Sequence, residues 1–155
     1  MTTFIGDYHC KLDSKGRLML PAVFKKQLAK EAGDRFVAKK DIFEKCLVLY
    51  PMDEWEIQNK IIRSKINPYK KEHNEFLRGF YRGMAELELD SSNRLLIPKR
   101  LLDEVGIAKD IVLAGQDSRI ELWPAEQYDK MGISEQSFAD LAEKIMGNGP
   151  LNNMV

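Results

Sequence analysis

The chain has 155 residues, of which 44% are hydrophobic and 31% are charged, and its 24 Lys and Arg side chains are balanced by 24 Asp and Glu side chains. This composition argues against wholesale disorder, and no apolar run approaches the roughly 20 residues of a membrane-spanning helix. The N-terminal residues have no secretory signal pattern, so we expect a cytoplasmic protein without a membrane partner. Two cysteines and two histidines, scattered along the chain, form no metal-binding pattern, and we expect no metal and no cofactor.

The first third of the chain predicts short strands around a tight turn, followed by helices that begin at prolines. Period-2 alternation indicates the strands, and the apolar stripe of Val23, Phe24 and Leu28 indicates a helix that starts at Pro21 and ends at Gly33. In chain order we expect a strand at 5–13, a turn at 13–16, a strand at 17–21, a helix at 21–33, strands at 36–40 and 46–50, and a helix from residue 51.

The rest of the chain repeats this plan after a mostly helical connection. A final helix at 134–147 has an apolar stripe of Phe138, Leu141 and Ile145, which we expect to face inward, and residues 147–155 are expected to form a disordered tail. In chain order we expect a connection at 54–82, a strand at 85–90, a turn at 91–93, a strand at 94–98, a helix at 98–106, strands at 110–116 and 120–124, a short helix around 126–132, and the final helix.

An internal repeat organises these elements. LDSKGRLMLP (12–21) matches LDSSNRLLIP (89–98) at a shift of 77 residues, and LVLYPMDEW (47–55) matches IELWPAEQY (120–128) at a shift of 73. Two copies are too few for a solenoid and favour a pseudo-two-fold pair within one chain. We therefore expect a β-rich α+β fold in which the two copies pair into a small barrel. The expected divisions are a first half at 1–53, a helical connection at 54–82, a second half at 83–130, and a C-terminal helix and tail at 131–155.

The repeated turn has a specific backbone chemistry. Asp13 and Asp90 can accept hydrogen bonds from backbone N–H groups two residues on, which forms an Asx-turn. Gly16 and Asn93 occupy equivalent places, and these residue types best tolerate a positive φ. We therefore expect these four residues to form two similar turns, each with a left-handed residue directly before an arginine.

The arginines that follow the turns, Arg17 and Arg94, have two interpretations. Each can pair with the aspartate four residues earlier and hold the hairpin together, which is worth at most about 1 kcal/mol at an exposed site. Alternatively, both project from similar loops toward a common anionic partner, because a guanidinium suits phosphate oxygens and guanine edges. The first turn has Lys15 where the second has Ser92, so the first loop should contribute more if the partner is DNA.

Charge is segregated along the chain although its sum is zero. Residues 56–82 carry seven Lys and Arg against three Glu, and residues 103–143 carry ten acids against three bases. Zero net charge therefore does not exclude a local anion-binding patch.

Catalysis finds little support in the sequence, which lacks the motifs of nucleophilic, phosphate-binding and zinc-dependent enzymes. One alternative is a small hydrolase or decarboxylase that uses Asp13 and Asp90 as paired carboxylates. Each aspartate has an arginine nearby that keeps it ionised, which removes the proton sharing that such a pair requires. We therefore expect a protein that is not an enzyme and has no small-molecule substrate.

The doubled DxxxR hairpin and its surroundings resemble the MraZ family of bacterial transcriptional regulators, which shares this hairpin with the broader AbrB-like swapped-hairpin superfamily. The resemblance covers about residues 4–130. It implies two AbrB-like halves in one chain, folded as a swapped-hairpin barrel with additional helices and assembled into a ring-shaped homo-oligomer. The segments that carry it are FIGDYHCKLDSKGRLMLPAVFK (4–25), CLVLYPMDEWE (46–56), LDSSNRLLIPKRLL (89–102) and IELWPAEQY (120–128).

The resemblance also implies a function and a site. The implied function is sequence-specific binding of double-stranded DNA at short direct repeats upstream of the family's own operon, in the division and cell-wall gene cluster, by a nucleoid-associated protein. The DNA contacts of the family fall on Lys15, Arg17 and Arg94. Asn93 departs from the glycine that is frequent in the family, which leaves the geometry of the second loop open. The alternative function is a protein-interaction or assembly module that does not bind DNA.

Overall fold

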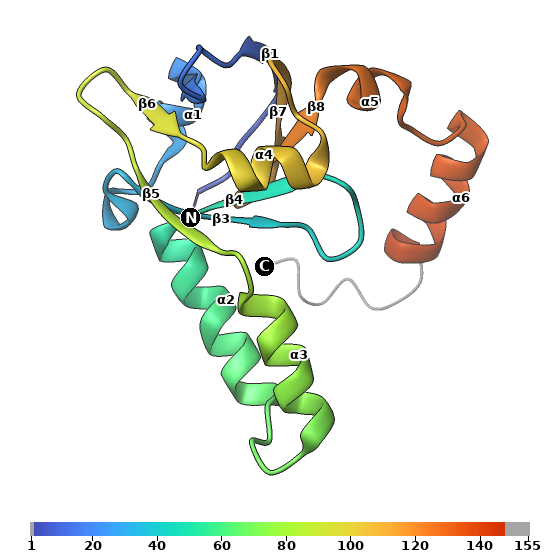
Figure 1. Ribbon diagram of the computed structural model, residues 1–155. Helices are drawn as coiled ribbons and strands as arrows, with labels where there is room; N and C mark the ends of the chain where they lie inside the picture. Colours follow the sequence, from blue (N-terminus) through green and yellow to red (C-terminus); the bar gives the residue numbers. More distant parts are fainter. Residues whose placement is uncertain (1, 148–155) are drawn as a thin grey trace.

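The computed structural model describes residues 2–147, which form eight β-strands, six α-helices and one 3-10 turn (Figure 1). Among these residues, no helix combines the length and apolarity that a bilayer span requires. In chain order the elements are β1 (Asp7–Lys11), β2 (Arg17–Met19), α1 (Ala22–Gln27), the 3-10 turn η1 (Lys30–Ala32), β3 (Arg35–Lys40), β4 (Leu47–Pro51), α2 (Met52–Lys65), α3 (Lys71–Tyr81), β5 (Ala85–Glu88), β6 (Arg94–Leu96), α4 (Lys99–Val105), β7 (Asp110–Gln116), β8 (Arg119–Pro124), α5 (Ala125–Lys130) and α6 (Glu135–Met146).

The expected α+β class is confirmed, but the fold is not β-rich, because more of the described residues lie in helices than in strands; the strands form two antiparallel sheets. Six strands lie in the order β1-β7-β8-β4-β3-β5, and β2 and β6 form a separate two-stranded ribbon. Each edge strand of the large sheet comes from one half of the chain and pairs with a strand of the other half, because β1 pairs with β7 and β5 pairs with β3. β1 and β5 do not pair with each other, so the described strands do not close into a barrel.

The main hydrophobic core lies between the large sheet and the layer that contains the ribbon, α1 and α4. Leu47 and Leu49 of β4 face this core, where Leu18 of β2 and Leu95 of β6 are also completely buried. The alternate residues of the same strand face the opposite side. There, Val48 packs in a second cluster with Trp55 of α2. The large sheet is therefore covered on both faces, which explains why every residue of β4 is buried.

The prolines of the repeat mark where helices begin. Pro21, Pro51, Pro98 and Pro124 directly precede α1, α2, α4 and α5, with φ values between −53° and −57°. A proline at a helix start loses no hydrogen bond, because the first backbone N–H groups of a helix have no partner within it. The same residue type thus starts equivalent helices in both halves.

The single helix expected at 21–33 is wrong. α1 ends at Gln27, and η1 follows after two extended residues, Leu28 and Ala29, whose ψ angles are 134° and 148°. The backbone N–H of Ala29 donates a hydrogen bond to Thr2 Oγ1 at 3.0 Å, and Leu28 packs against the main core. Tertiary contacts therefore stabilise a break that helix propensity did not predict.

The inward orientation expected for the last helix is also wrong within one chain. The side chains of Phe138, Leu141 and Ile145 on α6 are 63%, 45% and 64% exposed, and Figure 1 shows α6 apart from the sheets. The amphipathic pattern correctly predicts a helix, but residues 2–147 supply no surface that covers its apolar face. The tail expected at 147–155 lies outside the described residues from residue 148 onward.

Candidate nucleic-acid interface

The two copies of the repeated turn meet in the folded chain, although 77 residues separate them. β2 and β6 pair antiparallel around a central pair, Leu18 opposite Leu95, which are equivalent residues of the repeat. A strand pair centred on equivalent residues has a local two-fold axis at that centre. Arg17 lies opposite Leu96, and Met19 lies opposite Arg94.

Backbone hydrogen bonds outside the strands obey the same symmetry. The N–H of Leu20 donates to the carbonyl of Asn93, and the N–H of Ile97 donates to the carbonyl of Gly16, both at 3.0 Å. Each bond joins the end of one hairpin to the turn of the other. Because the bonds are reciprocal, each turn holds the other in place, and the two loops form one structural unit.

Inside each turn the carboxylate of the aspartate accepts three hydrogen bonds from its own loop. Asp13 Oδ1 accepts from the backbone N–H groups of Lys15 and Arg17, both at 2.9 Å. Asp90 Oδ1 accepts from the N–H groups of Ser92 and Arg94, at 2.8 and 2.9 Å. The third bond is an ion pair from the Nε of each arginine to Oδ2 of its aspartate, at 2.6 Å in the first turn and 2.9 Å in the second.

The left-handed residue before each arginine is present in both turns. Gly16 has a φ of 82° and Asn93 a φ of 60°. A Cβ added to Gly16 would lie 3.3 Å from the carbonyl oxygen of Ile97, so the first turn also leaves little room for a side chain. Asn93 adopts the left-handed conformation without glycine, because its short polar side chain tolerates this region. The second loop therefore has nearly the same backbone as the first.

These hydrogen bonds lower the pKa of both aspartates. In Asp13 the backbone N–H of Arg17 is the largest cause, followed among the stabilising contacts by the Arg17 side chain and the N–H of Lys15, and the pKa falls to about 2. In Asp90 the N–H of Arg94 has the largest effect, and the pKa is again lowered. Both carboxylates are thus ionised at neutral pH, which leaves no shared proton for acid–base catalysis by this pair.

The arginines are only partly engaged by these aspartates. Within residues 2–147, each ion pair uses Nε, and the terminal nitrogens of Arg17 and Arg94 have no protein partner. The two side chains are 30% and 31% exposed. The aspartate therefore orients the guanidinium, whose two terminal nitrogens remain available to a ligand. Both interpretations of the sequence, a local ion pair and a projecting cation, describe part of this geometry.

The outer face of the ribbon carries two further residues that the sequence interpretation missed. Met19 and Leu96 are 53% and 56% exposed, while the intervening Leu18 and Leu95 are buried. Since alternate residues of a strand share a face, Met19 lies on the face of Arg17, and Leu96 on the face of Arg94. The alternation in RLM and RLL was the available signal. This face thus presents two arginines on one diagonal and two apolar side chains on the other.

The two loops differ in the charge around them. Lys15 is exposed at the tip of the first turn, and it lines a cavity of about 330 Å³ together with Lys99 of α4. Ser92 takes the place of Lys15 in the second turn. Lys99 and Arg100, the two basic residues at the start of α4, have different contacts. Arg100 donates to the carbonyl of Gly83 at 2.6 Å, whereas Lys99 forms an ion pair with Asp103 at the surface.

Comparison with known proteins identifies the family of this chain. The family described as "MraZ protein, putative antitoxin-like" matches twice, over residues 3–79 and 80–148. Proteins named transcriptional regulator MraZ from Christiangramia forsetii and Flavobacterium psychrophilum are each 46% identical over 149 residues, which cover 96% of this chain and 96% and 94% of those proteins. A protein of the same name from Cytophaga hutchinsonii is 42% identical over 149 residues, 94% of this chain and 96% of its own length. Two matching copies and near-complete coverage establish that the chain belongs to the MraZ family.

Proposed function

We propose that this protein is a sequence-specific DNA-binding transcriptional regulator of the division and cell-wall gene cluster, and not an enzyme. It binds short direct repeats upstream of its own operon, in the cytoplasm and at the nucleoid. Three relatives that share 42% or more of their residues with it are named transcriptional regulators. The observation that carries the proposal is the β2–β6 ribbon, whose outer face holds Arg17 and Arg94 in symmetric positions.

A two-stranded ribbon of this kind fits the major groove of DNA. In the proposed complex the terminal nitrogens of Arg17 and Arg94 donate to the O6 and N7 acceptors of guanine, and their aspartates hold the guanidinium planes in place. Met19 and Leu96 contact thymine methyl groups, since an apolar contact is how the 5-methyl group is recognised. Lys15 contacts a phosphate and adds affinity that does not depend on sequence.

We further propose that the two halves interleave as swapped hairpins, which the pairing of β1 with β7 and of β5 with β3 supports. Several copies then form a ring-shaped homo-oligomer that presents its ribbons together to consecutive DNA repeats. One ribbon offers few contacts, but linked ribbons bind with a higher overall affinity because later contacts are intramolecular. The division at residues 53, 82 and 130 remains a prediction.

The test is a binding titration on DNA from upstream of the gene, with a scrambled duplex as competitor. Arg17→Ala and Arg94→Ala should each weaken specific binding, because a good bidentate contact is worth about 1–3 kcal/mol, or roughly 5- to 150-fold. Arg17→Lys keeps the charge but removes the planar fork, so it should lose preference for the operator while binding the scrambled duplex as before. Lys60→Ala, an exposed lysine on α2, is the control for charge alone.

The alternative of a protein-interaction module without DNA binding is favoured by the exposed apolar residues outside the ribbon, such as Phe43 and Phe138. Unchanged binding of both arginine variants to operator and scrambled duplex, with the fold retained, would contradict the regulator and favour this alternative.

A further inference from the structure

The arginines of the ribbon do not by themselves give it a direction on DNA. Arg17 and Arg94 are equivalent about the local two-fold axis between Leu18 and Leu95, so a half-turn about that axis exchanges them. A duplex held by these arginines alone would bind equally well in both directions, because each guanine contact of one direction has an identical counterpart in the other. Only residues that differ between the two copies of the turn can distinguish the directions.

Three pairs of equivalent residues at the tips and on the outer face of the ribbon differ, namely Lys15 and Ser92, Gly16 and Asn93, and Met19 and Leu96. The last pair is apolar in both copies. A lysine that contacts a phosphate adds affinity that does not depend on sequence, because a phosphate follows every base. The remaining pair differs in its capacity to recognise a base, since Gly16 has no side chain and Asn93 has an amide.

The backbone of the turn does not require an asparagine at this place. Gly16 has a φ of 82° and Asn93 a φ of 60°, so a glycine is sufficient in the equivalent turn. The N–H of Asn93 donates to the carbonyl of Asp90, and its carbonyl accepts from the N–H of Leu20, both at 3.0 Å. The backbone of Asn93 is thus held by two hydrogen bonds, and its side chain starts from a fixed point of the ribbon.

The side-chain amide of Asn93 is exposed and makes no hydrogen bond within residues 2–147. The other three asparagines of this range all use their side chains inside the fold: Asn59 accepts from the hydroxyl of Tyr81, Asn67 accepts from the N–H of Tyr69 at 3.0 Å, and Asn74 donates to the carbonyl of Pro68 at 3.0 Å. The amide of Asn93 therefore differs from these three, because both its donor and its acceptor are available to a ligand.

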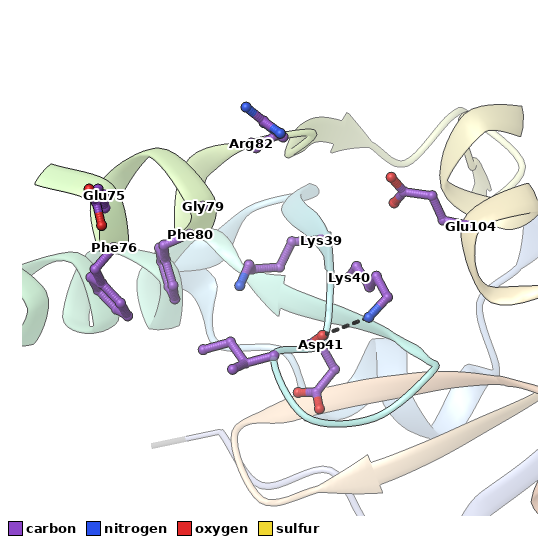
Figure 2. Close-up of a pocket in the computed structure, with 10 residues that line it drawn as sticks. Lys39, Lys40, Asp41, Glu75, Phe76, Gly79, Phe80, Arg82 and Glu104 are labelled. Atoms are coloured by element: carbon purple, nitrogen blue, oxygen red, sulfur yellow. Dashed lines mark hydrogen bonds between the residues drawn. The ribbon is translucent and has the colours of Figure 1, made fainter. Parts of the chain in front are cut away.

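The cavity between α3 and β3 is a weaker candidate for a binding site (Figure 2). Its volume is about 420 Å³, but its three acidic side chains balance its three basic ones. Lys39, the most buried of these charged residues, already contacts the face of the Phe80 ring, with its Nζ 3.8 Å from the ring centre. The charges of this cavity are thus balanced within the chain.

We propose that Asn93 recognises an adenine beside the guanine bound by Arg94 and thereby fixes the direction of the ribbon on DNA. The donor and the acceptor of its amide match N7 and N6 of adenine in the major groove. The first turn makes no such contact, because Gly16 has no side chain. Each bound repeat is therefore asymmetric, with an A·T pair specified only at the end that lies against the second turn. The inference rests on the proposed binding of DNA by the ribbon and assigns its direction.

The test is competition binding with duplexes from upstream of the gene in which each base pair of one repeat is replaced in turn. The wild type should lose roughly 5- to 150-fold in affinity when the A·T pair is replaced, as expected for a bidentate contact. Asn93→Gly keeps a residue that tolerates the left-handed turn, so it should become insensitive at that pair and keep the wild-type loss at the guanines. Ser92→Gly, at the neighbouring exposed position, is the matched control and should keep the wild-type profile.

A second variant and a direct measurement of direction complete the test. Asn93→Asp replaces the amide with a group that only accepts, so the preference at this pair should move from adenine to cytosine, whose N4 amino group donates. A photo-crosslinking amino acid at the exposed position of Ser91 should label one end of each repeat in the wild type and both ends in Asn93→Gly.

The outcomes separate the role of Asn93 from DNA binding itself. An adenine preference that survives in both Asn93→Gly and Asn93→Asp, or labelling of both ends when Asn93 is present, would overturn the role of Asn93 and leave recognition by the arginines intact. A wild type that does not distinguish the upstream DNA from the scrambled duplex would contradict the proposed function and this inference with it.

Discussion

The first and second loops of the ribbon share a backbone but differ in charge and in the helix that follows each of them in the chain. The first loop carries Lys15 and is followed by α1, whose only buried residue is Phe24. The second loop carries Ser92 and is followed by α4, which buries Leu101, Leu102 and Val105. The loop with the cation thus precedes the lightly packed helix in the chain, whereas the neutral loop precedes the deeply packed one.

This difference indicates how a duplicated unit can specialise without losing its symmetry. The reciprocal hydrogen bonds of the ribbon require only that the two backbones match, so the side chains at the loop tips and on the helices are free to differ. We infer that the second half contributes more to the stability of the shared unit, and that the first contributes more to contact with an anionic partner.

The largest effect on stability is expected from substitutions at the centre of the ribbon. Leu18→Ala and Leu95→Ala each remove a fully buried side chain, and we expect each to lower the free energy of unfolding by about 2–5 kcal/mol, measured by urea denaturation. Met19→Ala, on the exposed face, is the control and should change stability by less than about 0.5 kcal/mol. If only one of the two leucines proved costly, the symmetry of the ribbon would not extend to its energetics.

A smaller effect, on the salt dependence of DNA affinity, tests the difference in charge between the two loops. Lys15→Ala should reduce the slope of log K against log salt concentration by about one, because one phosphate contact is lost. Ser92→Lys should raise the slope by about one, since it supplies the second loop with the cation it lacks. The slopes come from titrations at several salt concentrations, with Lys60→Ala as the control. A slope that does not respond to either change would place both loop tips outside the DNA interface.

The smallest expected effect concerns pH. The pKa of Asp13 falls from 3.8 to about 2 in the folded chain, so its ionisation stabilises the fold above pH 3.8 and this contribution is lost as the pH drops toward 2. Asp13→Asn should therefore flatten the acid side of the stability curve in this window. Asp90→Asn should also reduce the loss of stability at acid pH, because the pKa of Asp90 is lowered as well. Denaturant midpoints measured between pH 2 and 5 check this, and an unchanged acid limb in both variants would contradict it.

The sequence predicted the elements well where their causes are local. The strand–turn–strand order, the proline starts of the helices and the α+β class all follow from patterns within about 15 residues. The helix expected at 21–33 failed at Leu28 and Ala29, where a contact from Thr2 decides the backbone. The inward face expected for α6 failed because periodicity shows that a helix is amphipathic, not what covers it.

The sequence by itself determined the two turns, because each aspartate bonds to N–H groups within four residues and each left-handed position holds a residue that tolerates it. Only the tertiary structure decided that the turns meet in one ribbon, that Met19 and Leu96 share its outer face, and that Lys39 is buried beside Phe80. The physical reason is distance along the chain. Contacts between residues more than 40 positions apart depend on how all the strands pack together, and no local pattern encodes that packing.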